Sequence, residues 1–135
     1  MNIYFCGSIS GGRQKVDDYA RLINELKKYG NVPTDHIGDK SLGLFEENKS
    51  PEEIFERDVK FLAEADVVFA ELTVPSLGVG YELGHAESLN KKIIGIYDKS
   101  VSERISLMIM GNKNIKIVGY NNIEEIINNI ESLIK

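Results

Sequence analysis

Between residues 67 and 90 the chain changes within a few positions from an apolar run to a glycine-bearing turn and then to a helix-like segment. Val67 to Ala70 are all apolar, and Pro75, Gly78 and Gly80 follow shortly after them. A short apolar run that ends in proline and glycine is typical of a buried strand and a turn, and the spacing beyond it is helical. This order directs the free N–H groups of a helix N-terminus toward a crevice, where they favour an anionic ligand.

A second unit of the same kind begins at Ile3, and alternating segments fill the rest of the chain. The apolar run up to Cys6 is followed by a glycine-rich turn, Gly7 to Arg13, and then by helical spacing. The expected strands are 3–6, 32–34, 67–70, 92–97 and 115–118, and each precedes an expected helix, at about 14–29, 50–64, 80–90, 101–110 and 122–134. This alternation predicts an α/β fold, a doubly wound, flavodoxin- or Rossmann-like parallel sheet of five strands with helices on both faces. We expect a single domain over residues 1–135, with its ligand crevice at the carboxyl ends of the strands.

Charge, hydropathy and cysteine usage exclude several classes of protein. The 135 residues carry a formal net charge of −5, so we expect no nucleic-acid surface. No apolar run approaches the ~20 residues of a membrane span. Met1 leads directly into the first expected strand without a basic leader, so we expect a cytoplasmic protein that does not contact a membrane. Cys6 is the only cysteine, which excludes an internal disulfide, and it is expected to pack as a small buried hydrophobe.

Glu82 is the first candidate for a reacting group. It follows the second turn, and the dipole of a helix keeps a carboxylate in its first turn ionised. Such a carboxylate can bind a sugar hydroxyl or attack an electrophilic carbon. The alternative that Glu82 only stabilises the helix start stays open from this residue alone. Gly78, Gly80 and Gly84 weaken a helix by about 1 kcal/mol each, which indicates close approach of a ligand or of the neighbouring strand.

Asp58 is the second candidate, because it interrupts an apolar stripe. Ser50, Pro51 and Glu53 predict a capping box at the start of a helix that runs to about Glu64. The apolar stripe of this helix consists of Ile54, Phe55, Val59, Phe61, Leu62 and Ala65, and Asp58 falls in its middle. A buried carboxyl tends to hold its proton, as a proton donor near neutral pH must. A structural role, as a cap or as the partner of a buried arginine, is the alternative.

Four parts of the sequence together resemble one enzyme family. They are Tyr4 to Ile9 with Gly11 to Arg13, Asp58, Ala65 to Val68, and the run Pro75 to Gly84, which reads PSLGVGYELG. On these residues the chain closely resembles the 2'-deoxynucleoside 5'-phosphate N-hydrolases, which belong with the nucleoside 2-deoxyribosyltransferases. The similarity extends from Ile3 to about Tyr120.

The resemblance implies cleavage of the N-glycosidic bond of a 2'-deoxynucleoside 5'-monophosphate, which gives the free base and 2-deoxyribose 5-phosphate. By position, Glu82 corresponds to the nucleophile, Asp58 to the acid that protonates the base, and Tyr4 to a tyrosine that supports the reacting carboxylate. One ionised carboxylate and one protonated acid are also the pair that an oxocarbenium-like transition state requires. This chemistry needs no metal or other cofactor, and the scattered acidic residues and two distant histidines suggest no metal site.

The substrate contacts that the resemblance implies lie mainly in the two turns. They are Gly7, Ser8, Ile9, Ser10, Gly11, Gly12 and Arg13 in the first turn, and Ser76 with Gly78 in the second. Ser106 corresponds to a serine that reaches the phosphate from the neighbouring subunit, so a homodimer follows from the resemblance, and His36 corresponds to a histidine near the base. Ser10 departs from the family, whose members commonly carry arginine there. We therefore expect phosphate binding to be weaker here or to depend on Arg13 and the serine hydroxyls.

Two alternatives to a hydrolase stay open. A nucleoside 2-deoxyribosyltransferase would use the same nucleophile on unphosphorylated nucleosides, and it would not need Ser8, Ser76 and Ser106 as phosphate contacts. A nucleotide-binding sensor without turnover would use the turns only to hold its ligand. Such a sensor would not require Asp58 in an apolar stripe, so we expect the hydrolase.

Overall fold

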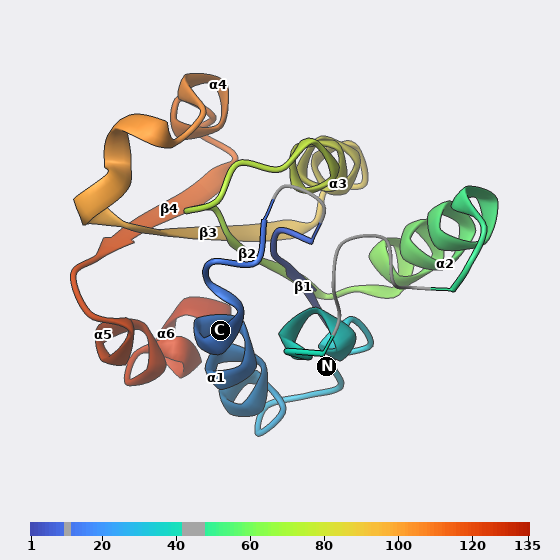
Figure 1. The fold of residues 1–135 in the computed structure, drawn as a ribbon, viewed down its shortest axis with the longest axis horizontal. Coiled ribbons are helices and arrows are strands. Elements are labelled where there is room, and N and C mark those ends of the chain that lie inside the picture. The colour runs from blue at the N-terminus through green and yellow to red at the C-terminus, as the bar shows by residue number, and fades with distance from the viewer. Residues whose placement is uncertain (10–11, 42–47) are drawn as a thin grey trace.

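The sheet has four parallel strands, one fewer than expected. The computed structural model describes residues 1–9, 12–41 and 48–135. Its strands are β1 (Ile3–Cys6), β2 (Val67–Glu71), β3 (Lys92–Asp98) and β4 (Ile115–Tyr120), which lie side by side in that order (Figure 1). All three pairings are parallel. An α/β fold with a parallel sheet is therefore confirmed, whereas the prediction of five strands is wrong for the part of the chain that the structure describes.

Residues 31–34, which include the expected fifth strand, run beside the outer edge of β1 without joining the sheet. Asn31 forms a single parallel bridge with Asn2. Pro33 has no N–H with which to continue a ladder. The Thr34 hydroxyl takes the place of main-chain partners, because its Oγ1 accepts the N–H of Phe5 at 2.9 Å and donates to the Phe5 carbonyl at 2.8 Å. A side chain thus satisfies the edge of β1, and no further strand forms there.

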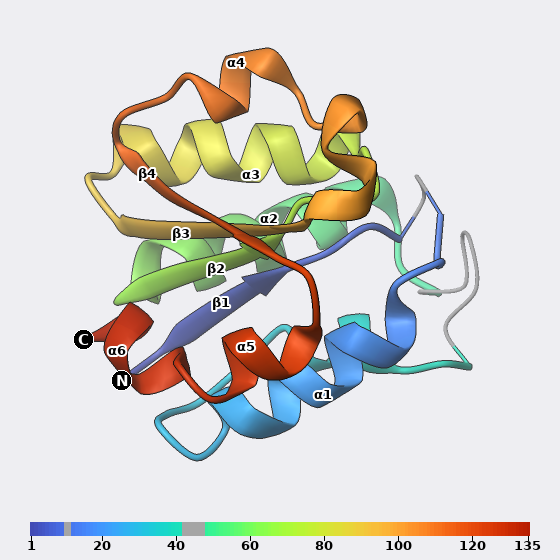
Figure 2. The same ribbon diagram turned by 90° about the vertical axis from the view of Figure 1, so that its left-hand side faces the viewer.

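Helices lie on both faces of the sheet (Figure 1, Figure 2). One face carries α1 (Val16–Leu26), α5 (Ile123–Ile127) and α6 (Ile130–Ile134), and the other carries α3 (Leu77–Ser88) and α4 (Leu107–Met110). Helix α2 (Pro51–Glu64) lies near the β1 end of the sheet, and two short 3-10 helices are η1 (Asp35–Gly38) and η2 (Lys99–Arg104). Among the described residues, none of these helices is long and apolar enough to cross a membrane.

The start of α2 is the predicted capping box. The Ser50 hydroxyl accepts the N–H of Glu53 at 3.1 Å, and the Glu53 carboxylate accepts the N–H of Ser50 at 3.4 Å. Pro51 occupies the first helical position, where its missing N–H costs nothing. The local sequence therefore determines where α2 begins.

Two expected helices are each divided in two. The side-chain amide of Asn129 donates to the Glu125 carbonyl at 2.7 Å, which is the carbonyl that its own N–H would use in a continuous helix. That N–H donates to the Ile126 carbonyl instead, so 122–134 becomes α5 and α6. The segment 101–110 becomes η2 and α4, because the Ser106 hydroxyl caps α4 by accepting the N–H of Ile109. Asparagine and serine compete with the helical ladder in this way.

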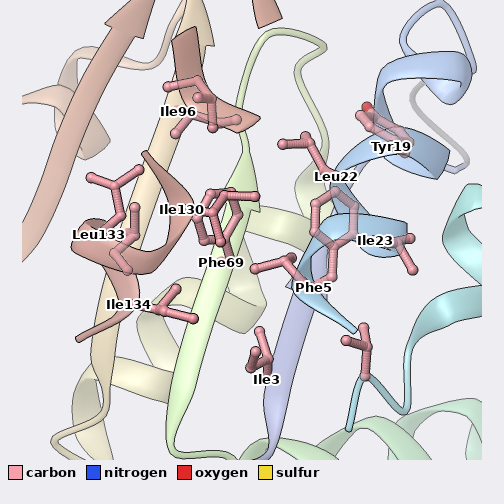
Figure 3. Close-up of a cluster of buried hydrophobic side chains, with 14 of the residues drawn as sticks. Ile3, Phe5, Tyr19, Leu22, Ile23, Phe69, Ile96, Ile130, Leu133 and Ile134 are labelled. Carbon is pink, nitrogen blue, oxygen red and sulfur yellow. The ribbon is translucent and has the colours of Figure 1, made fainter. Parts of the chain in front are cut away.

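The core has two layers, one on each face of the sheet. On the face of α1, α5 and α6, strand residues such as Ile3, Phe5 and Phe69 pack against helical side chains (Figure 3). Tyr4 and Cys6 belong to the second layer, with residues of α2 and α3. Because successive residues of a strand point to opposite faces, β1 directs Tyr4 and Cys6 toward α3.

Candidate active site

A cavity of about 1050 Å³ opens between α2 and α3, over the carboxyl ends of β1 and β2. Its wall includes Gly7 and Ile9 after β1, Leu72 and Val74 after β2, and Ser106 before α4. Both predicted turns therefore contribute to one cavity. This is the edge of a parallel sheet at which α/β proteins bind their ligands.

Glu82 lies in the second turn of α3 and lines this cavity. The expectation that it stands in the first helical turn is wrong, because Ser76 is the N-cap of α3 and accepts the N–H of Val79 at 3.3 Å. Burial raises the pKa of Glu82 from 4.5 to about 7, and the negative charge of Asp58 also raises it. Desolvation therefore outweighs any ionising effect of the helix dipole, which fades within the first turn.

Tyr4 and Cys6 hold the Glu82 carboxyl from β1. The Tyr4 side chain is hydrogen-bonded to Glu82, and Cys6 Sγ donates to Glu82 Oε2 at 3.5 Å. Burial raises the pKa of the Tyr4 hydroxyl and of the Cys6 thiol well above the usual value of each, and the charge of Glu82 raises both further. Both groups therefore stay protonated and can donate a hydrogen bond. Sequence reasoning singled out Tyr4 but assigned Cys6 to packing alone. The alternation of a strand could have indicated it, since positions i and i+2 share a face.

Asp58 faces the same cavity from α2. The structure describes all of α2, and Leu62 is its one buried residue, whereas Ile54, Asp58 and Val59 line the cavity. Around Asp58 the stripe is therefore a cavity wall, whereas Leu62 and Ala65 pack in the core, which explains how a carboxylate can interrupt it. The expected burial of Asp58 is wrong, because its side chain is 23% exposed and its Oδ1 lies 2.9 Å from Nε of Arg57.

Arg57 connects Asp58 to His36. The Nη2 atom of Arg57 lies 3.4 Å from Nε2 of His36 in η1. His36 does not line the 1050 Å³ cavity, and its contact with Arg57 connects it to Asp58. Sequence reasoning missed Arg57, for which adjacency to Asp58 was the only indication. Within the described ranges, no group of three or more histidine, cysteine or acidic residues could hold a metal ion.

The turn after β1 is built against Tyr19 of α1. The N–H of Ser8 donates to the Tyr19 hydroxyl at 3.1 Å. A Cβ atom on Gly7 would come within 2.9 Å of the Tyr19 ring, and Gly12 has a φ of +135°, so both positions require glycine. Ser8 is fully buried, and its Oγ has no hydrogen-bond partner in the described part of the chain. The predicted contact Ser8 does not itself line the 1050 Å³ cavity, although Gly7 and Ile9 on either side of it do.

Arg13 supports this turn from behind. Its guanidinium donates to the carbonyl oxygens of Ser8, Ile37 and Asp39, at 3.1, 2.7 and 2.8 Å. Arg13 does not line the cavity. The predicted contacts Ser10 and Gly11 lie outside the residues that the structure describes.

The glycines of α3 do not bring the helix close to its strand, contrary to one of the two expectations for them. A Cβ atom on Gly78 would lie 3.8 Å from Ser76 Oγ and 3.9 Å from Glu82 Oε1. On Gly80 or Gly84 it would have no neighbour within 4 Å. Gly78 and Gly80 do line the cavity, which leaves ligand access as the reason for small residues at these two positions.

Five exposed apolar side chains line the cavity or follow closely after Ser106, which lines it. Leu77, Leu107 and Met108 are 97%, 87% and 89% exposed. Phe55 of α2 and Tyr81 of α3 are also exposed and line the cavity, with ring centroids 6.4 Å apart. We refer to these five residues as the apolar rim. Exposed apolar side chains beside a cavity are typical of an interaction site.

The sequence matches a known family over most of its length. A family model described as "Nucleoside 2-deoxyribosyltransferase" matches residues 3–122. A relative from Danio rerio named 5-hydroxymethyl-dUMP N-hydrolase is 48% identical over 112 residues, which cover 82% of this chain and 78% of the relative.

Two solved structures share the fold at low sequence identity. The Clostridium botulinum CMP N-glycosidase BcmB has a TM-score of 0.70 and 22% identity, covering 97% of this chain and 99% of that one. The solution structure of BlsM has a TM-score of 0.78 and 21% identity, covering 98% and 88%. At such identities the likeness concerns the fold alone.

Proposed function

Because the chain belongs to the nucleoside 2-deoxyribosyltransferase family, we propose that it hydrolyses the N-glycosidic bond of 2'-deoxynucleoside 5'-monophosphates. The products are the free base and 2-deoxyribose 5-phosphate. In this proposal residues 1–135 form one doubly wound deoxyribosyltransferase-like domain that acts in the cytoplasm. The name of the Danio rerio relative makes 5-hydroxymethyl-dUMP the first substrate to test.

The observation that carries the proposal is the desolvated carboxyl of Glu82 in the cavity wall. Its pKa of about 7 keeps a substantial ionised fraction at neutral pH while burial removes the water that would weaken it as a nucleophile. Tyr4 and Cys6 fix its orientation from β1. A carboxylate held in this way is suited to attack the anomeric carbon of a sugar.

Asp58 supplies the proton. Asp58 faces the same cavity from α2, where a proton on its carboxyl can pass to the departing base. With Glu82 ionised and that proton on Asp58, a bond forms between Glu82 and C1′ as the C1′–N bond breaks. The electron pair of the broken bond stays on the base nitrogen, which takes the Asp58 proton.

Water completes the reaction. The Asp58 carboxylate, now deprotonated, accepts a proton from a water molecule that attacks C1′. The bond between C1′ and Glu82 breaks, which regenerates the Glu82 carboxylate and releases 2-deoxyribose 5-phosphate. Asp58 then carries the proton for the next cycle.

The phosphate is assigned to hydroxyl and main-chain donors. The buried hydroxyl of Ser8 has no hydrogen-bond partner among the residues that the structure describes, and Ser76 lines the cavity at the N-terminus of α3. Three carbonyl oxygens occupy the guanidinium of Arg13, so we assign it to holding the turn, and its Nε remains without a partner within the described residues. A helix N-terminus with serine donors suits a phosphate monoester.

A homodimer is part of the proposal. The apolar rim exposes Leu77 and Leu107, each directly after a serine that lines the cavity, Ser76 and Ser106. A second copy of the chain on this surface would bury the rim and bring its own Ser106 to the phosphate. The family resemblance of Ser106 points to the same role.

The experiment that tests the activity is base release measured by chromatography. The substrates are 5-hydroxymethyl-dUMP, the four common deoxynucleoside monophosphates, the matching nucleosides and one ribonucleotide, with wild type beside Glu82→Gln. We expect release from deoxynucleoside monophosphates, absent in the variant. Base exchange on unphosphorylated nucleosides would instead identify a transferase, and ligand binding without any release would identify a sensor.

The dimer is tested separately by sedimentation of wild type, Leu107→Asp and Leu89→Asp. Leu89 is also partly exposed but lies at the other end of α3, so its variant controls for an added charge. We expect Leu107→Asp to be monomeric with a raised KM for the monophosphate. A dimer that survives this change with an unaltered KM contradicts the assignment of the apolar rim.

A further inference from the structure

The two oxygens of the Glu82 carboxyl have different surroundings. Oε2 accepts a hydrogen bond from Cys6 Sγ at 3.5 Å. Oε1 lies on the side of Gly78, where an added Cβ atom would stand 3.9 Å from it. Gly78 is exposed and lines the cavity. The Cys6 thiol therefore holds one oxygen against β1, and the other lies toward Gly78 in the cavity wall.

Cys6 is placed as a donor and not as a reacting group. It is fully buried at the end of β1, directly before Gly7. Burial raises the pKa of its thiol well above the usual range, and the charge of Glu82 acts in the same direction. The thiol therefore stays protonated, and its hydrogen is available to the carboxylate.

We propose that Cys6 is a positioning residue for the reaction, which holds Oε2 of Glu82 so that Oε1 is the oxygen that attacks the anomeric carbon. The inference rests on the proposed function and adds to it a residue and the identity of the attacking oxygen. A thiol is a weak donor, so it orients the carboxylate without stabilising the ionised ground state as strongly as a hydroxyl would. Tyr4 binds the same carboxyl from the same strand.

The groups that face Glu82 determine what a Cys6 variant will change. From β1 they are Tyr4 and Cys6, and from α2 they are Asp58 and Arg57. The two β1 donors and the Arg57 charge lower the pKa of Glu82, while burial and Asp58 raise it. Loss of the thiol hydrogen removes one lowering contribution, so the pKa of Glu82 rises and the acidic limb of the rate profile moves to higher pH.

The test compares Cys6→Ser with Cys6→Ala. The two side chains leave similar space, but only serine can donate. We measure kcat and KM for a deoxynucleoside monophosphate across pH 5 to 9, which is about two units on each side of the Glu82 pKa. For Cys6→Ala we expect kcat to fall roughly tenfold with little change in KM, and the acidic limb to shift to higher pH. Cys6→Ser should keep kcat near that of wild type and its acidic limb at the wild-type pH or lower.

Equal kinetic constants and equal pH profiles for the two variants would overturn the inference, because packing alone would then explain Cys6. If Cys6→Ala does not fold, Cys6→Val replaces it, since valine fills the thiol site without a donor. A wild-type protein that releases no base overturns this inference together with the proposed function. An active wild type and an inactive Glu82→Gln, beside Cys6 variants that do not differ, would overturn the inference alone.

Discussion

Glu71 is fully buried and Glu82 is half-buried, and the two carboxyl groups have the same pKa shift in different surroundings. Burial raises the pKa of each from 4.5 to about 7. Glu71 ends β2 and is hydrogen-bonded to Tyr120, on the face of α1 and α5. Glu82 lies on the opposite face, against Cys6.

The two residues differ in access to the cavity. Thr73 encloses Glu71 by donating its N–H and its hydroxyl to Oε1, and Glu71 does not line the 1050 Å³ cavity. Its Oε2 has no hydrogen-bond partner among the described residues. Glu82 is held from one side and open on the other. A shifted pKa therefore identifies burial, and only an opening to a ligand makes the group a candidate for chemistry.

The largest expected effect separates the two glutamates by activity. We expect Glu82→Gln to lower kcat by at least about 10³-fold, because it removes the nucleophile. Glu71→Gln makes the same change of shape and charge at the other glutamate, and it should leave kcat nearly unchanged. Base release from a deoxynucleoside monophosphate measures both. Equal losses of activity in the two variants would contradict the distinction by cavity access.

Asp58 extends the comparison of the two glutamates, because Glu82 shares its cavity with this second carboxyl and Glu71 does not line the cavity. We expect Asp58→Asn to lower kcat by roughly 10²- to 10³-fold, since the base must then leave without a proton. A substrate whose base leaves readily as an anion should lose much less. Glu56→Gln, an exposed change on the same helix, serves as the control. An equal loss for both kinds of leaving group would show that Asp58 does not act as the acid.

We expect the two glutamates to make similar contributions to the pH dependence of the free energy of unfolding. Each has a folded pKa of about 7 and an unfolded value of 4.5, so the folded state binds the proton more tightly. The stabilisation is therefore fully present below pH 4.5 and is lost as the pH rises through 7. We expect the free energy of unfolding to fall by about 3 kcal/mol per glutamate over this interval. Urea unfolding at several pH values measures it, and Glu71→Gln or Glu82→Gln should each flatten part of the curve.

A pH profile that Glu71→Gln leaves unchanged would show that Glu71 does not titrate in this interval. The exposed Glu56→Gln again provides the control, since an exposed carboxyl has little effect on this dependence.

The smallest expected effect concerns the enclosure of Glu71. Thr73→Val removes one hydroxyl donor from the buried carboxyl and should lower the free energy of unfolding by about 1–2 kcal/mol, with kcat little changed. Thr73→Ser keeps the donor and should retain most of the stability. Urea unfolding at pH 7.5 compares the two. A Thr73→Ser protein as unstable as Thr73→Val would assign the effect to the lost methyl packing.

Features of the fold that depend on neighbours in sequence were predictable. The capping box of Ser50 and Glu53 begins α2 as expected, and the apolar runs became parallel strands. The fifth strand was not predictable in the same way. Its loss depends on Thr34, whose hydroxyl meets Phe5 of β1 across 29 positions of the chain.

The candidate site was predictable in its two carboxyl groups but not in its electrostatics. Glu82 and Asp58 both line the cavity, whereas their expected environments are reversed. Asp58 is partly exposed beside Arg57, and Glu82 is the carboxyl whose pKa desolvation raises. The contact of Cys6 with Glu82 likewise joins residues 76 positions apart.

The sequence by itself determined the order of strands, turns and helices and the two carboxyl groups that belong together. Periodicity, capping and glycine turns act over a few residues, so they can be inferred from local patterns. Only the tertiary structure decided which carboxyl is desolvated, which of its oxygens is held, and which of the two glutamates opens to a cavity. Desolvation and hydrogen bonding depend on the neighbours that β1, α2 and α3 bring together, and these neighbours are far apart in the chain.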